Sequence, residues 1–151
     1  MGQSLSKIYV HLIFGTKNHL PLIKEDFEKR LWSYLAGAFK KYDSPAIIIN
    51  GVSNHVHILF VLSKNIALAK LIEEVKKQSS KWAKEAGENN KKFTWQIGYA
   101  AFSISSSKVD VVKEYIEKQK EHHKKKTFKE EVEEFFEQYD VIAYKEKYFW
   151  T

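Results

Sequence analysis

Apolar residues along this chain follow two kinds of spacing, and the changes between them predict its elements. Short apolar or alternating runs bounded by turn residues predict strands, whereas apolar residues that recur every three or four positions predict one face of a helix. Between 24 and 42, for example, Phe27, Leu31, Leu35 and Phe39 fall on one helical stripe. Strands are predicted over 8–15, 46–50, 53–61 and 100–104, and helices over 24–42, 66–85, 108–125 and 128–139.

The order of these elements, β-α-β-β-α-β-α, predicts an α+β fold. Residues 51–54 form a tight connection between two strands, so we expect a hairpin there. A hairpin interrupts the alternation of strands and helices, which favours an antiparallel or mixed sheet with helices packed on it, close to the split βαβ plan. Ser107 is the predicted N-cap of the third helix. Because we find no repeat, low-complexity tract or linker, we expect a single domain over 1–151 with a C-terminal helical extension.

The composition limits the classes to which the protein can belong. The chain has 151 residues, of which 44% are hydrophobic, enough for one packed core. It has no cysteine, which excludes disulfides, thiolate metal sites and cysteine nucleophiles. No apolar run approaches the ~20 residues of a membrane span, and no secretory signal is evident, so we expect a cytoplasmic protein with no membrane partner. The formal charge of +6 is compatible with a polyanionic partner.

The third predicted strand carries His55 and His57, separated by one apolar residue. Strand side chains alternate faces, so both imidazoles lie on the face of Leu59, while Val56 and Ile58 point to the other face. Their Cα atoms are then roughly 6.6 Å apart, close enough for both rings to bind one ion. Polar groups on a core strand are costly unless they are paired. A metal ion is one such partner, and ordinary hydrogen bonds to structural histidines are the alternative.

A second polar line lies on the third predicted helix. Tyr115, Gln119 and His123 follow at intervals of four and share one face, with His122 beside them and Lys124 next in the chain. An amide oxygen suits hard cations, and two histidines with one amide leave positions open for phosphate oxygens, as in catalytic sites. A tyrosine beside such a site can be a nucleophile. The alternative for this line alone is a solvated helix edge.

The two segments together resemble a known family. Asn54-His55-Val56-His57, followed downstream by the run from Tyr115 to His123, resembles the single-tyrosine transposases of the HUH nuclease superfamily. These are the TnpA-like enzymes of small insertion sequences and their relatives associated with repeated palindromes. Thr16-Lys17 and the segments 95–99 and 102–105 are similar to family features in the same order, so the resemblance extends over nearly the whole chain.

The resemblance implies a ferredoxin-like or RRM-like fold, a homodimer, and cleavage and rejoining of single-stranded DNA beside hairpins in a prokaryotic cell. It implies Mg²⁺ or Mn²⁺ held by His55, His57 and Gln119, and a 5′-phosphotyrosine bond formed by Tyr115. Support of the metal or contact with phosphate is the expected role of four further residues, namely His11, His122, His123 and Lys124. Whether Tyr115 serves its own subunit or a partner cannot be deduced from one chain.

Other interpretations of the paired histidines fit less well. A histidine-triad hydrolase needs a third histidine where this chain has Leu59, and a cupin barrel is incompatible with three long helical stretches. Two alternatives stay open within the superfamily: a replication-initiator or relaxase-like nickase, and a non-catalytic palindrome-binding relative.

Overall fold

The computed structural model describes residues 2–140 and 149. The elements in chain order are β1 (Tyr9–Gly15), η1 (Lys17–His19), α1 (Glu25–Lys41), β2 (Ala46–Val52), β3 (His55–Val61), α2 (Leu68–Glu85), η2 (Glu88–Asn90), β4 (Ala100–Ile104), η3 (Ser106–Lys108), α3 (Val109–Glu117), α4 (Gln119–His122) and α5 (Phe128–Gln138). Residues 1, 141–148, 150 and 151 lie outside the described residues, and so does the part of the single-domain prediction that covers them.

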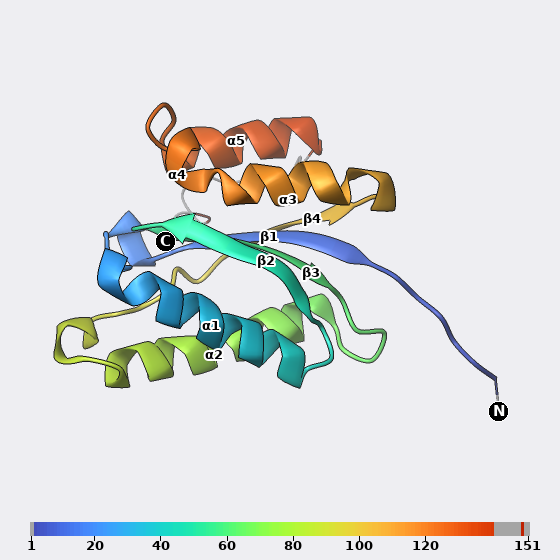
Figure 1. The fold of residues 1–151 in the computed structure, drawn as a ribbon, viewed down its shortest axis with the longest axis horizontal. Helices are drawn as coiled ribbons and strands as arrows, with labels where there is room; N and C mark the ends of the chain where they lie inside the picture. Colours follow the sequence, from blue (N-terminus) through green and yellow to red (C-terminus); the bar gives the residue numbers. More distant parts are fainter. Residues whose placement is uncertain (1, 141–148, 150–151) are drawn as a thin grey trace.

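The four strands form one antiparallel sheet in the order β2-β3-β1-β4. Helices α1 and α2 lie on one side of the sheet, and α3, α4 and α5 lie on the other (Figure 1). This confirms the predicted α+β fold, an antiparallel sheet with helices packed on it and a helical extension after the last strand. Within the described residues, no helix is both long and apolar enough to span a bilayer.

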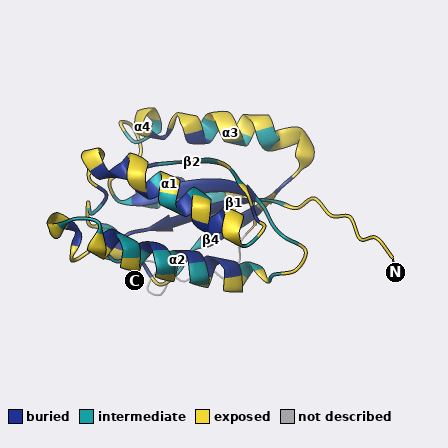
Figure 2. Cartoon of the chain, turned by 60° about the horizontal axis from the view of Figure 1, so that its bottom comes forward, coloured by how far each residue is buried: buried dark blue, intermediate teal, exposed yellow. Residues whose placement is uncertain are grey.

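Strand β3 lies between two layers of helices, and its alternation divides its side chains between them. Val56, Ile58 and Phe60 enter the main core with apolar residues of α1 and α2. Leu59 faces the other layer, where it packs with Ile116 of α3. The central strands β1 and β3 are accordingly buried between helices whose outer surfaces are exposed (Figure 2). Each fully buried side chain of this size contributes about 1.5–3 kcal/mol of hydrophobic free energy, so this register is strongly favoured.

The hairpin between β2 and β3 places His55 at the start of its strand. Val52 pairs with His55, which leaves Ser53 and Asn54 as the turn. Gly51 pairs with Val56, and a Cβ atom at Gly51 would lie only 2.3 Å from the carbonyl oxygen of His55. This position therefore requires glycine.

Two local predictions about the third helix are wrong. The segment 108–125 contains two helices rather than one, because Lys118 (φ −98°, ψ 19°) separates α3 from α4. Its amide hydrogen is shared between the carbonyl oxygens of Glu114 and Tyr115. Ser107 is not the N-cap: it lies inside η3 with its hydroxyl 3.1 Å from that of Ser105, and Lys108 precedes α3 without a side-chain cap.

Helix α5 begins with a capping box. The hydroxyl of Thr127 accepts a hydrogen bond from the amide of Glu130, whose carboxylate accepts one from the amide of Thr127. This cap fixes the first turn of α5. The next residue, Glu131, is thereby turned toward the sheet and is only 2% exposed.

Candidate metal and tyrosine site

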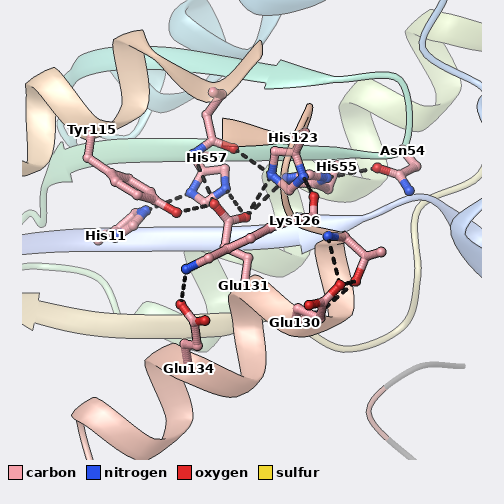
Figure 3. Close-up of polar contacts among 12 residues, drawn as sticks. His11, Asn54, His55, His57, Tyr115, His123, Lys126, Glu130, Glu131 and Glu134 are labelled. Carbon is pink, nitrogen blue, oxygen red and sulfur yellow. Dashed lines mark hydrogen bonds and ion pairs between the residues drawn. The ribbon is translucent and has the colours of Figure 1, made fainter. Parts of the chain in front are cut away.

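A cluster of buried polar side chains lies between the sheet and helices α3, α4 and α5 (Figure 3). Strand β3 supplies His55 and His57, the neighbouring strand β1 supplies His11, and α5 supplies Glu131. His123, directly after α4, completes the group. Buried polar groups need partners, so their contacts define what this cluster can do.

One carboxylate oxygen lies at the centre of the cluster. The Oε1 atom of Glu131 is 3.3 Å from Nε2 of His55, 2.9 Å from Nε2 of His57 and 3.0 Å from Nε2 of His123. We call these three residues the histidine trio. Each member presents the same ring nitrogen to the same oxygen, although the three come from two separate parts of the chain.

The other ring nitrogen of each trio member, Nδ1, also has a polar partner. Nδ1 of His55 lies 2.8 Å from Oδ1 of Asn54, and Nδ1 of His57 lies 2.8 Å from Nε2 of His11. Nδ1 of His123 lies 2.9 Å from the carbonyl oxygen of Lys126. Because a carbonyl oxygen can only accept, Nδ1 of His123 carries a hydrogen and donates it to Lys126. Such outer partners orient metal-binding imidazoles in known sites.

The second carboxylate oxygen of Glu131 faces helices α3 and α4. Its Oε2 atom accepts a hydrogen bond from the Tyr115 hydroxyl and another, at 3.1 Å, from Nε2 of Gln119. The amide oxygen of Gln119 lies 3.1 Å from Nε2 of His123. The ring of His122 stacks on that of Tyr115, with centroids 4.4 Å apart. The break at Lys118 therefore does not separate the residues predicted to share a face.

Burial and charge shift the pKa values in this cluster. Burial lowers the pKa of His55 to about 4, and burial with the nearby His57 lowers the pKa of His11 well below its usual range. Burial alone would raise the pKa of Glu131, but the charge of His57 and hydrogen bonds with His123 and His57 hold it well below the usual range. Burial, and then the charge of Glu131, raise the pKa of Tyr115 above its ordinary range. At neutral pH the site therefore contains a carboxylate and a protonated phenol.

Two cavities border the cluster. A cavity of about 780 Å³, which we call the lysine cavity, is lined in part by Asn54, His123, Lys120 and Lys124–Lys126. Lys120 pairs with Glu28 at 2.9 Å, and Lys126 pairs with Glu134. Lys124 and Lys125 form no ion pair with the described residues. A second cavity of about 260 Å³, which we call the tyrosine cavity, is lined by Tyr115, Glu131 and His11 together with apolar side chains of α3 and α5.

The structure brings together most of the residues that the sequence singled out. His55, His57, Gln119 and His123 meet around Glu131, and Tyr115 joins them through its hydroxyl. His11 supports His57, and His122 packs against the tyrosine ring. Lys124 lies apart from the hydrogen-bonded cluster and lines the lysine cavity.

Sequence reasoning missed Glu131. The signal was present, because α5 has its apolar residues at 128, 132, 135 and 136, and position 131 falls inside that inward-facing arc. A carboxylate among buried phenylalanines calls for a partner. Glu131 was not singled out because α5 contains several other acidic residues, most of them on its outer face.

The cluster fits a divalent cation. Nε2 of His55 is buried and makes no hydrogen bond with the residues that the structure describes. One ligand atom from each member of the histidine trio and from Glu131 lie within 4.8 Å of one another. Imidazole and carboxylate together suit transition metals. The group could therefore hold a metal ion.

Fold and cluster together define a class of protein: an α+β protein whose four-stranded antiparallel sheet carries, on one face, a candidate metal centre beside a tyrosine. A family model described as "Transposase IS200 like" matches residues 4–119, which include His55, His57, Tyr115 and Gln119. The chain therefore belongs to the IS200-like transposase family, as the sequence resemblance indicated. A comparison with curated proteins found no match.

Solved structures share the fold. A candidate transposase from Deinococcus radiodurans R1 is 18% identical with a TM-score of 0.65, covering 79% of this chain and 96% of that one. A REP-associated tyrosine transposase bound to a REP hairpin is 13% identical with a TM-score of 0.59, covering 82% of this chain and 74% of that one. At these identities the likeness concerns the fold.

Proposed function

We propose that this protein is a DNA transposase that cleaves and rejoins single-stranded DNA near hairpins through a 5′-phosphotyrosine intermediate, with a divalent metal ion. The observation that carries this proposal is the position of the Tyr115 hydroxyl. It bonds to the same carboxylate that gathers the histidine trio, in a chain of the IS200-like transposase family.

The proposed metal ligands are His55, His57 and Gln119, with His123 as the next candidate. His11 and Asn54 orient the two strand histidines from behind. A bound Mg²⁺ or Mn²⁺ ion would supply positive charge at the scissile phosphate. The buried face of the sheet keeps the imidazoles in place and limits competing water at their Nε2 atoms.

Tyr115 is the proposed nucleophile. Its phenol loses its proton, its oxygen bonds to phosphorus, and the bond from phosphorus to the 3′-oxygen breaks. The DNA is left with a free 3′-hydroxyl, and the 5′ side stays bonded to the tyrosine, so the energy of the phosphodiester is kept for rejoining. Because the pKa of Tyr115 is raised by burial and by Glu131, the phenol needs positive charge nearby to react at neutral pH.

The proposed substrate is single-stranded DNA with hairpin ends. The REP-associated relative was solved with a REP hairpin, which supports a DNA partner of this kind. The lysine cavity borders the histidine trio, and phosphates of a strand in that cavity would meet Lys124 and Lys125.

The protein is proposed to act as a homodimer. Each protomer is proposed to consist of one HUH transposase domain over 1–151. In the described residues, Tyr115 and the histidine trio of a single chain already contact one carboxylate. Completion of the site from within one protomer is therefore the arrangement that these contacts favour.

A cleavage assay tests the function. An end-labelled single strand with a hairpin is incubated with the protein and Mn²⁺, and covalent adducts and cleavage products are separated on a denaturing gel. Tyr115→Phe should bind the hairpin nearly as well as the unmodified protein but form no adduct. Tyr34→Phe, which removes a hydroxyl on the opposite side of the sheet, is the matched control and should cleave normally. Persistent cleavage by Tyr115→Phe would remove this tyrosine from the mechanism.

A further inference from the structure

The position of Glu131 within the site is not explained by the ligands proposed above. It is 2% exposed on a helix face whose neighbours Phe128 and Val132 are also buried. An unpaired carboxylate there would cost several kcal/mol. Its partners are the histidine trio, Tyr115 and Gln119, so every strong contact of this side chain belongs to the candidate site.

The two oxygens of Glu131 have different surroundings. Oε1 is directed to the three Nε2 atoms of the histidine trio, whereas Oε2 is directed to Tyr115 and Gln119 (Figure 3). A carboxylate oriented in this way can bind a cation through one oxygen and hold the hydroxyl of the nucleophile with the other. Neither the backbone nor a neutral amide at this position could offer two negatively charged acceptors.

The distances around Oε1 agree with those between ligands of one ion. In a coordination shell with bonds of about 2.1 Å, neighbouring ligand atoms at about 90° to 109° lie about 3.0 to 3.4 Å apart. Oε1 lies 3.3, 2.9 and 3.0 Å from Nε2 of His55, His57 and His123. Oε1 can therefore keep its position relative to the trio when a cation is shared among them.

Glu131 also lies outside the part of the chain that the family model matches. The family match covers 4–119 and so ends before α5 (Phe128–Gln138). Helix α5 adds this carboxylate from the C-terminal segment, where the Thr127 capping box fixes its first turn. The contribution of Glu131 is thus a feature of this chain that the matched segment does not contain.

We propose that Glu131 is a ligand of the metal ion, bound through Oε1, and that its Oε2 positions the Tyr115 hydroxyl beside that ion. The inference rests on the proposed function and extends its ligand set beyond the residues found from the sequence. The ligand atoms available are then the imidazole nitrogens of the trio, the amide oxygen of Gln119 and the carboxylate oxygen of Glu131. Because most of them are imidazole nitrogens, the site would take a transition metal ion such as Mn²⁺ or Co²⁺ in preference to Mg²⁺.

Metal binding tests the inference without relying on catalysis. Mn²⁺ and Co²⁺ are titrated by calorimetry into metal-free unmodified protein, Glu131→Gln, Glu131→Asp and Glu137→Gln. Glu137 is exposed on the same helix, so its variant removes one negative charge without touching the cluster. Glu131→Gln should weaken binding of both ions by at least about tenfold, the smaller end of what loss of even an outer partner of a ligand causes. Glu131→Asp should lose less affinity for the two ions, and Glu137→Gln should bind them as tightly as the unmodified protein does.

The Co²⁺ absorption spectrum adds a readout that a structural role would not change. Loss of a carboxylate ligand should alter the visible bands of the Co²⁺-loaded Glu131→Gln variant, while the Glu137→Gln spectrum stays the same. Circular dichroism in EDTA checks that each variant is folded. If Glu131→Gln binds Mn²⁺ as tightly as the unmodified protein, or more tightly, the carboxylate does not hold the ion. If binding weakens but the Co²⁺ bands are unchanged, the carboxylate is only an outer contact. Either result overturns the inference.

The same experiment separates this inference from the proposed function. If the unmodified protein binds no divalent ion and His57→Ala changes nothing, the proposed metal-dependent transposase fails. If His57→Ala abolishes binding and Glu131→Gln does not weaken it, only the role of Glu131 fails.

Discussion

The carboxylate of Glu131 on α5 accepts a hydrogen bond from the hydroxyl of Tyr115 on α3. The same carboxylate contacts the histidine trio, so the helix that carries the candidate nucleophile is connected to the sheet through one side chain. Tyr115, the proposed nucleophile, and the candidate metal centre are therefore parts of one hydrogen-bonded network.

Stability should depend on pH because buried histidines are held neutral. The pKa of His55 is lowered to about 4 in the folded protein, and that of His11 is also lowered, chiefly by burial. The unfolded chain binds these protons near pH 6.5, so stability is full above that pH and is lost as the pH falls from about 6.5 toward about 4. His55 alone corresponds to about 3 kcal/mol at most.

Urea unfolding of metal-free protein at pH 7.5, 5.5 and 4.5 measures this loss. The variant His55→Gln removes the titrating ring, so its free energy of unfolding should fall less steeply over the same range. Equal stability of the unmodified protein at pH 7.5 and 4.5 would contradict the neutral, buried state of His55.

A divalent transition metal should stabilise the folded protein. An ion that binds only the folded state adds about 2.7 kcal/mol when its free concentration is a hundred times the dissociation constant. Because most of the available ligand atoms are imidazole nitrogens, Mn²⁺ should raise the melting temperature at lower concentration than Mg²⁺ does. Differential scanning calorimetry with either ion, and with EDTA added afterwards, measures the shift. A shift of equal size in His57→Ala would indicate that the ion binds elsewhere.

The active site should be completed within one protomer. The contacts of Tyr115 with Glu131 and His122 are all within the described chain. A mixture of Tyr115→Phe and His57→Ala proteins should therefore stay inactive in the labelled-strand assay, even after co-expression. Recovery of cleavage in the mixture would show that the tyrosine of one subunit serves the histidines of another, and co-purification of differently tagged chains reports whether dimers formed at all.

Lys124 and Lys125 should contribute electrostatically to DNA binding. Both are exposed beside the lysine cavity, and each phosphate contact with a single strand adds about 0.7 to the slope of log affinity against log salt concentration. The double change to glutamine should weaken binding and reduce that slope by about 1.4. Fluorescence anisotropy over a salt series measures both quantities.

The matched control for this charge change is the double variant of Lys29 and Lys40 to glutamine. These lysines are exposed on α1, on the opposite side of the sheet. If this control reduces the slope as much as the change at 124 and 125 does, the DNA does not follow the lysine cavity.

The strand pattern made the fold and half of the site predictable. Alternation in β3 placed His55 and His57 on one face and Val56 and Ile58 on the other, as the structure has them. The hairpin excluded a parallel doubly wound sheet. These conclusions rest on the two-residue period of strand side chains. Burial of the strand faces then fixes the register, because a slip of one residue would exchange the two sets of side chains.

The contacts between distant segments were not predictable in the same way. Lys118 is neither glycine nor proline, so no residue type marks the break between α3 and α4. The partner of His11 depends on strand pairing, which one sequence does not reveal. Glu131 was hidden among other acidic residues, because periodicity shows which face a residue occupies and not which buried group it meets.

The alternation of β3 has a consequence for misfolded forms of this protein. A slip of one position along β1 would push imidazoles among the phenylalanines beneath α1 and α2 and would turn valine and isoleucine toward Glu131. Such a chain would lose its apolar interior and the group proposed to bind metal in the same step. Preparations should accordingly contain either competent molecules or unfolded ones, and the folded fraction measured by spectroscopy should equal the fraction able to bind metal.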